Sequence, residues 1–484
     1  MLPFPRAAVA CVGAVLALSL AACGSQLDPD TVAQVNGSAV DGGGQAVAAG
    51  GAAGSGPDGS VPGAAGGTDG GAGSTTGGTT GTTGGSGSGG GSGTQGTGAN
   101  AATGATKAGS CDGFKNQTGI TDKTIVIGNS SDVSGPVPGL FEASQDAVRA
   151  YVAYFNATSD ICGRKLELKT YDSRTDAAAD QQAYTQACDD TFAMVGSMSA
   201  FDSGGAGTAQ GCGLPDLRSA SVTADRQACT TCFGAQSTQA DEFQNAVPDF
   251  VKKNHPDAAA HAAMLYINAG AAAENGKTQV TAMEKRGMHF DYVQGIDISE
   301  FNYAPYVQQM KDKGVEYVQM IGATAQFVRL AQAMQQQGFH PEVFMLDPTA
   351  YTRDFVQSGG DAVEGATLFI NFTPFEEASS NKELQLYLSW LQQVKPGAEP
   401  SFFGLFSWSA ARLFVERATA LGGKLTRASL IADLRKVDNW TANGMHSPQH
   451  VGPHHTGECW RFISLQHGRW VPVGGTKYSC SGTS

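Results

Sequence analysis

The stretch TIVIGNSSDVSGPVPG, residues 124–139, decides the fold, because it joins a short apolar strand to a loop rich in serine, glycine and proline. Its beginning, residues 124–129, is largely β-branched and apolar, which is typical of a strand buried on both faces. The segment that follows, residues 142–156, repeats apolar residues at helical spacing: Ala147, Val148, Tyr151, Val152 and Phe155. A buried strand, a loop and an amphipathic helix in this order predict a parallel sheet covered by helices.

The same alternation continues along the chain. Further strands are predicted at residues 165–171, 192–196, 214–222, 262–267, 289–293, 316–322, 342–347 and 366–371. Helices are predicted at residues 176–189, 239–253, 272–286, 303–313, 325–337, 351–357, 382–394 and 402–421, and a cysteine-flanked hairpin at 459–480. The predicted fold class is therefore α/β with parallel sheets, in which ligands bind beyond the carboxyl ends of the strands.

Composition and charge narrow the function. The chain has 484 residues and a formal net charge of −13, without a cluster of lysine or arginine. A groove for nucleic acid and a basic patch for membranes both need such clusters, so neither is expected. The first 110 residues or so hold too few large apolar side chains to form a core. The rest of the chain is large enough for a core that divides into two lobes.

The chain begins with the features of a bacterial lipoprotein. An apolar run at residues 7–20 is shorter than the ~20 residues of a membrane-spanning helix, but it suits the hydrophobic region of a signal peptide. The sequence Leu-Ala-Ala-Cys at residues 20–23 then resembles the bacterial lipobox, in which the cysteine is lipidated and the preceding segment is removed. We expect residues 1–22 to be the signal peptide and Cys23 to anchor the protein in the lipid bilayer through two or three acyl chains. The alternative is an ordinary signal peptide followed by an incidental cysteine.

Residues 23–110 are predicted to be a disordered tether. Glycine, serine and threonine dominate this segment, and it cannot bury enough apolar surface to offset its chain entropy. A coil of roughly 65 such residues has a typical span of ~45 Å. A lipid-held domain on this tether can move above the membrane.

The cysteines indicate an oxidising compartment. Of ten cysteines, Cys11 lies in the signal peptide and Cys23 takes the lipid, so eight remain. An even number in an exported chain indicates four disulfides, although spacing alone does not fix their connectivity. The short Cys229–Cys232 spacing also fits a redox pair, but no strand–helix pattern places it at a helix start, as thioredoxin-like chemistry requires. The expected pairs are Cys111–Cys162, Cys188–Cys212, Cys229–Cys232 and Cys459–Cys480.

Six segments carry a resemblance to a known family. They are SSDVSGPVPG (130–139), NATSDICGRKLELKTYDSRTD (156–176), FAMVGSMSAFDSG (192–204), MLYINAG (264–270), YVQMIGATAQ (317–326) and MLDPTAY (345–351). This ordered set resembles the type I periplasmic solute-binding proteins of the leucine/isoleucine/valine-binding family, over residues 119–470. The resemblance implies two Rossmann-like lobes that are joined by three crossovers and close on a small solute. It places the first lobe at residues 111–240 and 370–440, and the second at residues 241–369 and 441–484.

In the first lobe, the family's ligand-binding loops correspond to strand-end loops rich in hydroxyl groups. Hydroxyls and helix-start N–H groups suit a carboxylate, because a helix N-terminus carries partial positive charge. The alternative for each hydroxyl is a helix cap or a turn that satisfies the backbone. The residues that the resemblance places at the ligand are Ser131, Asp132, Ser134, Ser197, Ser199, Ala200, Phe201, Ser221 and Thr223.

In the second lobe, family members that bind α-amino acids carry tyrosines in two loops that lack them here. Asp347 stands near the family's acidic partner for a ligand amine, and Tyr351 follows it; the alternative for Asp347 is a helix cap or a hinge carboxylate. Without the aromatic rings the cleft is expected to be roomier and less suited to a cation, so a free branched-chain amino acid is not the expected ligand. The residues at the tyrosine loops are Asn268, Ala271, Ala323 and Thr324.

Four of the nine histidines lie in one segment, HSPQHVGPHHTGEC, at residues 446–459. Imidazoles this close together can bind zinc or copper. The spacing is irregular and is interrupted by proline and glycine, so no helical face presents two ligands together. We therefore expect a solvated loop rather than a metal site, and no cofactor. The histidines are His446, His450, His454 and His455.

These features predict a lipid-anchored solute receptor on the outer face of the bacterial cytoplasmic membrane. It is expected to be a monomer that delivers a small molecule, amino-acid-like, amide or another small metabolite, to an ABC permease. One alternative is an extracytoplasmic sensing module that is not coupled to transport. A second is an exported enzyme, although the chain contains no G-x-S-x-G, H-E-x-x-H or P-loop pattern.

Overall fold

The computed structural model describes residues 107–484. The predicted signal peptide, Cys23 and nearly all of the predicted tether lie outside these residues. Within residues 107–484, no helix combines the length and the apolar character needed to cross a bilayer.

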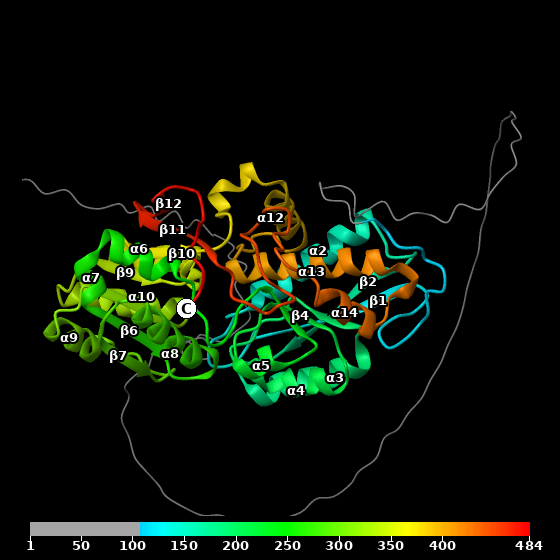
Figure 1. Ribbon diagram of the computed structural model, residues 1–484, viewed down its shortest axis with the longest axis horizontal. Coiled ribbons are helices and arrows are strands. Elements are labelled where there is room, and N and C mark those ends of the chain that lie inside the picture. The colour runs from blue at the N-terminus through cyan, green and yellow to red at the C-terminus, as the bar shows by residue number, and fades with distance from the viewer. Residues whose placement is uncertain (1–106) are drawn as a thin grey trace, which may run out of the picture. The chain divides into compact units, whose positions relative to one another are not determined.

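The first sheet is parallel throughout, as predicted. Its strands are β1 (Thr124–Ser131), β2 (Lys165–Asp172), β3 (Ala193–Val195), β4 (Asp216–Ala220) and β5 (Cys232–Gln236), in the order β2-β1-β3-β4-β5. The helices that connect them are α2 (Glu142–Thr158), α3 (Ala177–Asp190), α4 (Ser203–Gly211) and α5 (Ala224–Ala228). Three helices from later in the chain join this sheet: α12 (Lys382–Val394), α13 (Phe402–Leu421) and α14 (Arg427–Leu434). The orange α13 accordingly lies close to the green β4 in Figure 1.

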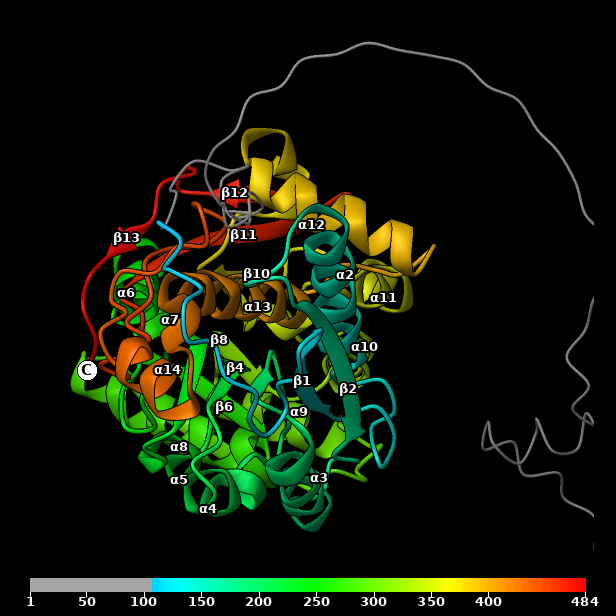
Figure 2. The same ribbon diagram turned by 90° about the vertical axis from the view of Figure 1, so that its right-hand side faces the viewer.

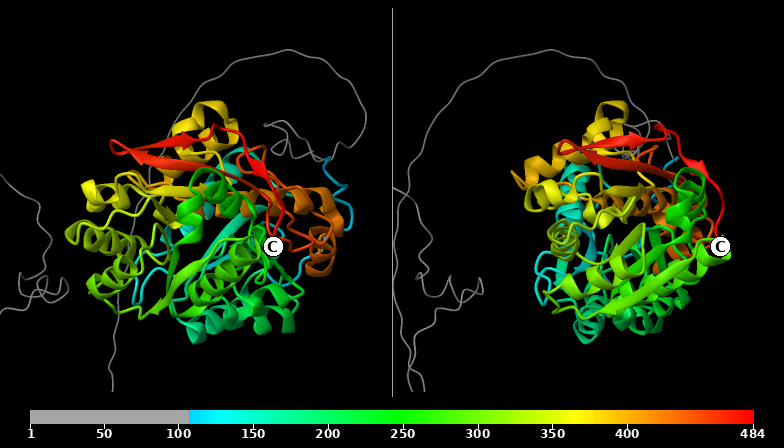
Figure 3. Two further views of the ribbon diagram at one scale, coloured as in Figure 1. Left: turned by 60° about the vertical axis from the view of Figure 1, so that its left-hand side comes forward. Right: turned by 90° about the vertical axis from the view of Figure 1, so that its left-hand side faces the viewer.

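The second sheet is mixed, because the predicted C-terminal hairpin adds antiparallel strands to a parallel part. Its parallel part has the order β7-β6-β8-β9-β10, and β11 and β12 extend it in the antiparallel sense because the C-terminal hairpin enters against β10. Figure 3 shows this red hairpin along one side of the lobe. The strands are β6 (Ala262–Ile267), β7 (Phe290–Ile296), β8 (Tyr317–Ile321), β9 (Val343–Leu346), β10 (Thr367–Ile370), β11 (Cys459–Gln466) and β12 (Arg469–Val473), and β13 (Ser479–Cys480) pairs with β11. The helices are α6 (Ala246–Asn254), α7 (Pro256–Ala260), α8 (Gly270–Lys285), α9 (Ala304–Asp312), α10 (Thr324–Gln336) and α11 (Arg353–Gly359).

The chain passes between the two sheets three times, as predicted. We call the first sheet with α2–α5 and α12–α14 the first lobe, and the second sheet with α6–α11 the second lobe. The first crossover follows β5, the second follows β10, and the third follows α14. The second crossover returns the chain to the first lobe. In Figure 2 the helices α12 and α13 therefore lie beside α2, which comes much earlier in the chain. Short 3-10 turns complete the described chain: η2 (Pro348–Ala350), η3 (Gly360–Val363), η4 (Phe375–Ser380) and η5 (Gly422–Lys424).

Several elements differ from the sequence prediction for identifiable reasons. The strand β5 was not predicted, because its short segment CFGAQ contains a glycine and lacks β-branched residues. The helix α4 was also missed, because SGGAGTAQG is rich in glycine and has low helix propensity. The predicted helix at 239–253 begins only at Ala246, because residues 239–245 belong to the first crossover.

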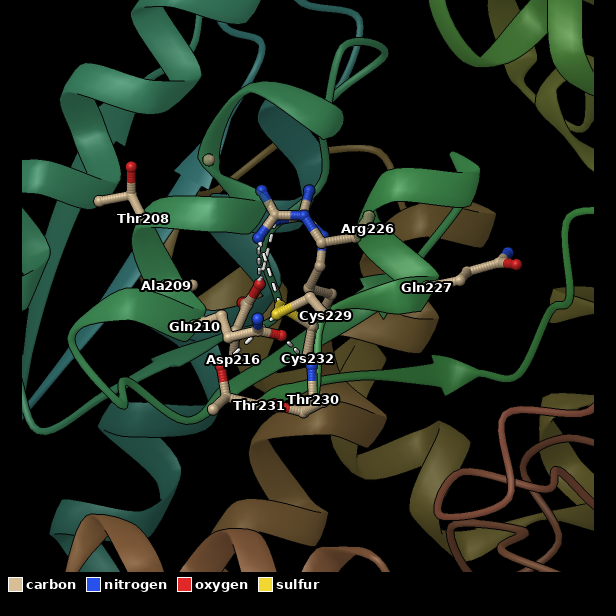
Figure 4. The surroundings of a disulfide bond; sticks show 12 residues. Thr208, Ala209, Gln210, Asp216, Arg226, Gln227, Cys229, Thr230, Thr231 and Cys232 are labelled. Carbon is tan, nitrogen blue, oxygen red and sulfur yellow. Dashed lines mark hydrogen bonds and ion pairs between the residues drawn. A yellow bond between two sulfur atoms is a disulfide. The ribbon is translucent and has the colours of Figure 1, made fainter.

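All four expected disulfides are present. Three of them close loops of 21 to 51 residues, and the fourth joins Cys229 to Cys232. Cys229 is 4% exposed and Cys232 is 1% exposed. The disulfide between them lies beside the guanidinium of Arg226 (Figure 4). A buried disulfide at the end of α5 is suited to a structural role.

A buried group of charges holds the helices of the first lobe to its sheet. We call it the arginine–aspartate cluster: Arg218, Arg226, Asp180, Asp202 and Asp216. The Arg226 guanidinium donates to Asp216 on β4 at 2.8 Å and to Asp180 on α3 at 2.9 Å. Burial raises the pKa of Asp180 to about 6, against the lowering effect of the two arginines. The cluster therefore ties α3, α5 and β4 together in a region without solvent.

Arg226→Met is expected to destabilise the protein by about 3–5 kcal/mol, because it leaves Asp180 and Asp216 buried without this cation. Urea denaturation followed by circular dichroism measures the change. The matched control is Arg286→Met, which breaks an exposed pair with Asp249 and is expected to leave the midpoint close to that of the wild type. Equal shifts for the two variants would contradict the assigned role of the cluster.

Candidate ligand-binding cleft

A cavity of about 230 Å³ lies where the carboxyl ends of strands from both lobes face each other. The first lobe supplies residues that follow β3 and β4, such as Ala200 and Val222. The second lobe supplies residues that follow β6, β8 and β9, such as Ala269, Ala323 and Asp347. This is the position at which open parallel sheets bind ligands.

The walls of the cavity are mainly apolar, and the residues that form them include neither lysine nor arginine. Two acidic residues, Glu242 and Asp347, reach the cavity. The aromatic residues of the wall are Phe141, Phe201, Phe243, Phe369, Phe402, Phe403 and Trp460. Apolar walls with a few polar groups are typical of sites for small organic ligands.

The sequence-predicted site residues divide into two groups. Ala200, Phe201, Ala271, Ala323 and Asp347 line the cavity. The others are not among its lining residues, and contact of these residues with a ligand stays a prediction. They are Ser131, Asp132, Ser134, Ser197, Ser199, Ser221, Thr223, Asn268, Thr324 and Tyr351.

Asp132 organises the wall of the first lobe. Its carboxylate is fully buried and accepts hydrogen bonds from Ser173 Oγ at 2.6 Å and Thr175 N at 2.9 Å, in the loop after β2. It also accepts from Ser199 Oγ at 3.2 Å and Ala200 N at 2.8 Å, in the loop after β3. Asp132 therefore fixes three strand-end loops, and two of its partners, Thr175 and Ala200, line the cavity.

Three other predicted hydroxyl residues donate to side chains within the first lobe. Ser134 Oγ donates to Asp172 Oδ2 at 2.5 Å, and Ser131 Oγ donates to Asn129 Oδ1 at 2.8 Å. Thr223 caps α5 and donates to Asp202. Ser221 differs, because its hydroxyl is buried and has no partner among the described residues.

In the second lobe, Asp347 caps η2 by accepting from Thr349 N at 2.7 Å. Burial raises the pKa of Asp347 to about 6. Tyr351 points into a different cluster, where its ring packs against Phe372 and Phe375 and its hydroxyl donates to Glu376. Thr324 Oγ1 lies 3.4 Å from Thr349 O, and the Asn268 N–H donates to Ile296 O at 2.8 Å.

The lobes touch directly beside the cavity. The Ala271 N–H at the start of α8 donates to Ala200 O at 2.9 Å, and Ala224 N donates to Glu274 Oε2 at 2.9 Å. Gly270 makes the first contact possible, because its φ is +48° and a Cβ atom there would lie 2.3 Å from Ala200 O.

Some cavity residues were missed by the sequence analysis because they do not lie in the strand-end loops that it singled out. Phe243 and Gln244 precede α6, Phe402 and Phe403 begin α13, and Trp460 lies on β11. The rule that ligands bind at strand ends does not find them. The only sequence feature that could have indicated any of these residues is the pair of phenylalanines, Phe402 and Phe403, at the start of a predicted helix.

The histidine segment is not the solvated loop that was expected. His446 is 2% exposed, and its ring stacks on Phe406 with centroids 4.7 Å apart. His450 pairs with Asp438 at 2.6 Å, and the imidazole of His454 packs against the ring of Phe233. The segment therefore packs on the first lobe. Within residues 107–484 no three His, Cys, Asp or Glu side chains are grouped to hold a metal ion.

Two α/β lobes, three crossovers and a cavity between the strand ends define a type I periplasmic binding protein. Residues 124–469 match the family model described as periplasmic binding protein, so the chain belongs to this family. The family consists of extracytoplasmic binding proteins for small molecules. A comparison with curated proteins found no relative of significant similarity.

Solved structures of this family share the fold at low sequence identity. A fatty acid ABC transporter substrate-binding protein from Thermomonospora curvata is 18% identical, with a TM-score of 0.66 over 76% of this chain and 96% of that one. A leucine-binding protein from Thermotoga maritima is 14% identical, with a TM-score of 0.63 over 72% of this chain and 98% of that one. A solute-binding protein from Rhodopseudomonas palustris in complex with p-hydroxybenzoic acid is 16% identical, with a TM-score of 0.62 over 74% and 98%.

Acidification is expected to destabilise the protein through His446. Burial lowers the pKa of His446 to about 4, whereas an unfolded histidine titrates near 6.5. Between these values the unfolded chain binds a proton that the folded chain does not, so the free energy of unfolding falls as the pH falls.

His446→Gln keeps a hydrogen-bonding side chain that does not titrate. Its free energy of unfolding is expected to fall by about 3 kcal/mol less than that of the wild type between pH 7 and pH 4. Urea denaturation at a series of pH values measures the two slopes. Parallel pH profiles would show that His446 is not the group responsible.

Proposed function

We propose that the protein is a lipid-anchored extracytoplasmic solute-binding protein, which captures a small molecule between two closing lobes and delivers it to an ABC importer. The observation that carries the proposal is the cavity, whose walls come from strand ends of both lobes. A solute in it touches both lobes at once. We propose that Ala200, Phe201, Ala271, Ala323 and Asp347 contact this solute.

Closure of the lobes is the proposed signal to the importer. A solute that contacts both walls binds the closed form better than the open form, and only this difference in affinity shifts the population toward closure. The two hydrogen bonds between the lobes, from Ala271 to Ala200 and from Ala224 to Glu274, are contacts of the closed form.

The anchoring and the partner follow from the sequence. Lipidation of Cys23 holds the protein on the outer face of the cytoplasmic membrane, and the tether lets a monomer reach its permease. We propose that the protein returns its solute chemically unchanged. Binding of the solute-loaded protein to purified permease and to a membrane sensor separates the two alternatives. Binding to the sensor but not to the permease would favour the sensing alternative.

A saturable solute is expected to raise the thermal midpoint of the protein by mass action. A thermal-shift screen of amino acids, amides, short peptides, aromatic acids, fatty acids and sterols identifies it. Small-angle scattering of residues 107–484 with this solute is expected to show compaction. No hit across the screen, or unchanged scattering at saturation, would contradict the proposed function.

Gly270→Ala is expected to weaken solute binding at least tenfold, because its Cβ atom collides with Ala200 O when the lobes meet. Isothermal titration calorimetry measures the loss. Gly207→Ala is the matched control, since Gly207 lies in α4 with no atom near its Cβ position, and this change is expected to raise stability and leave affinity unchanged. Equal affinities for both variants would exclude the contact from closure.

A further inference from the structure

Side-chain amides supply half of the polar residues that line the cavity. They are Asn275 and the glutamines 227, 236, 239, 244, 279 and 326. Three of them are fully bonded within the protein. Gln227 bonds to Ser221 and Ala240, Gln239 bonds to Asp241 and His455, and Gln326 bonds to Ala323 and Ile298.

Gln244 is different, because it is 0% exposed and neither its amide nitrogen nor its amide oxygen has a partner among the described residues. A buried amide without partners costs free energy, so native proteins rarely keep one without a reason. The backbone on both sides of Gln244 is held by hydrogen bonds, so the amide does not reach solvent by a shift of the chain. The neighbouring Phe243 N donates to Ser484 O at 3.0 Å and Asn245 N donates to Gly482 O at 2.9 Å, which pins the segment to the C-terminal residues.

A second amide leaves a donor free. Tyr317 donates to Gln319 Oε1 at 2.5 Å, and Gln319 Nε2 donates to Gln279 Oε1 at 2.7 Å. This chain of bonds occupies the acceptor of Gln279 and leaves its amide nitrogen without a partner in the described structure. Gln244 therefore offers the cavity a donor and an acceptor without partners, and Gln279 offers a donor.

The charges of the wall argue against an ionised ligand. A carboxylate would be desolvated in a cavity whose described lining holds no cation and already contains Glu242 and Asp347. Both acids are also engaged by the backbone, since Glu242 accepts from Thr456 N at 3.1 Å and Asp347 accepts from Thr349 N at 2.7 Å. The aromatic walls suit an apolar body.

We propose that the cavity selects an uncharged ligand, with an apolar body and a neutral group that both donates and accepts hydrogen bonds, and that Gln244 is the residue that binds this group. The inference rests on the proposed function and names its solute class. Primary amides and hydroxyl compounds have this chemistry, whereas fatty acids and free amino acids do not at neutral pH.

The test compares three probes that share one alkyl chain: octanamide, octanoate and octylamine. Calorimetry on the full chain with Cys23→Ser at pH 7 is expected to show octanamide binding at least tenfold more tightly than either ion. Gln244→Met removes the amide, with both of its polar atoms, at similar volume. It is expected to lower octanamide affinity at least tenfold and to raise the thermal midpoint without ligand, because it removes an unpaired buried amide.

The matched control is Asn371→Leu. Asn371 is also 0% exposed, and both of its amide atoms also lack partners, but it does not line the cavity. This variant is expected to raise the midpoint and leave octanamide affinity unchanged. Gln244→Leu repeats the test if the methionine variant does not fold.

Each contrary result overturns the inference. Tighter binding of octanoate or octylamine excludes a neutral ligand, and unchanged octanamide affinity in both Gln244 variants excludes that residue. No saturable binding of octanamide also overturns it. The wider screen then separates the two proposals, since a hit among charged solutes keeps the proposed function and rejects only this solute class.

Discussion

The buried carboxylate of Asp132 is the contact on which the cleft depends. A carboxylate without solvent is tolerated because four donors, two hydroxyls and two backbone N–H groups, satisfy it. These donors lie in the loops after β2 and β3, while Asp132 itself follows β1. One of them is the N–H of Ala200, whose carbonyl in turn accepts from Ala271 in the second lobe. One continuous set of hydrogen bonds thus runs from the first sheet, through the cavity wall, to the start of α8.

The arginine–aspartate cluster also holds loops that form the first lobe's wall of the cavity. Asp202 accepts from Val222 N at 2.9 Å and also from Thr223, so it holds the loop after β4 to the start of α4. Arg226 donates to the backbone of Asp202 at 2.7 Å and to Asp180 and Asp216 through its guanidinium. A wall fixed in this way loses little conformational entropy when a ligand binds, so more of the contact free energy remains as affinity.

The sequence predicted the two-sheet α/β architecture because buried strands and amphipathic helices have periods that a single chain displays. It also predicted four disulfides from the even number of cysteines, and all four expected pairs are present, although spacing alone left their connectivity open. It did not predict β5 or α4, whose glycines weaken both signals. In the site, the strand-end rule found Ala200, Ala323 and Asp347, but not Phe243, Phe402 or Trp460. Phe243 lies in the first crossover and Trp460 follows the third, whereas Phe402 begins α13 within the first lobe, so only the tertiary structure shows that the three meet at the cavity.

Three aromatic side chains of the cavity lie near the crossovers that connect the two lobes. Phe243 lies in the first crossover, Trp460 follows the third, and the ring of Phe402 packs against Phe372 in the second, with centroids 5.5 Å apart. The first of these crossovers is also paired with the C-terminal residues 482–484. A solute that fills the space between the aromatic rings therefore acts on the crossovers directly. We propose that closure draws its free energy mainly from apolar contact with the described lining, at ~25 cal/mol per Å² buried. The closed form is then favoured in proportion to the apolar area that an uncharged solute presents to both lobes.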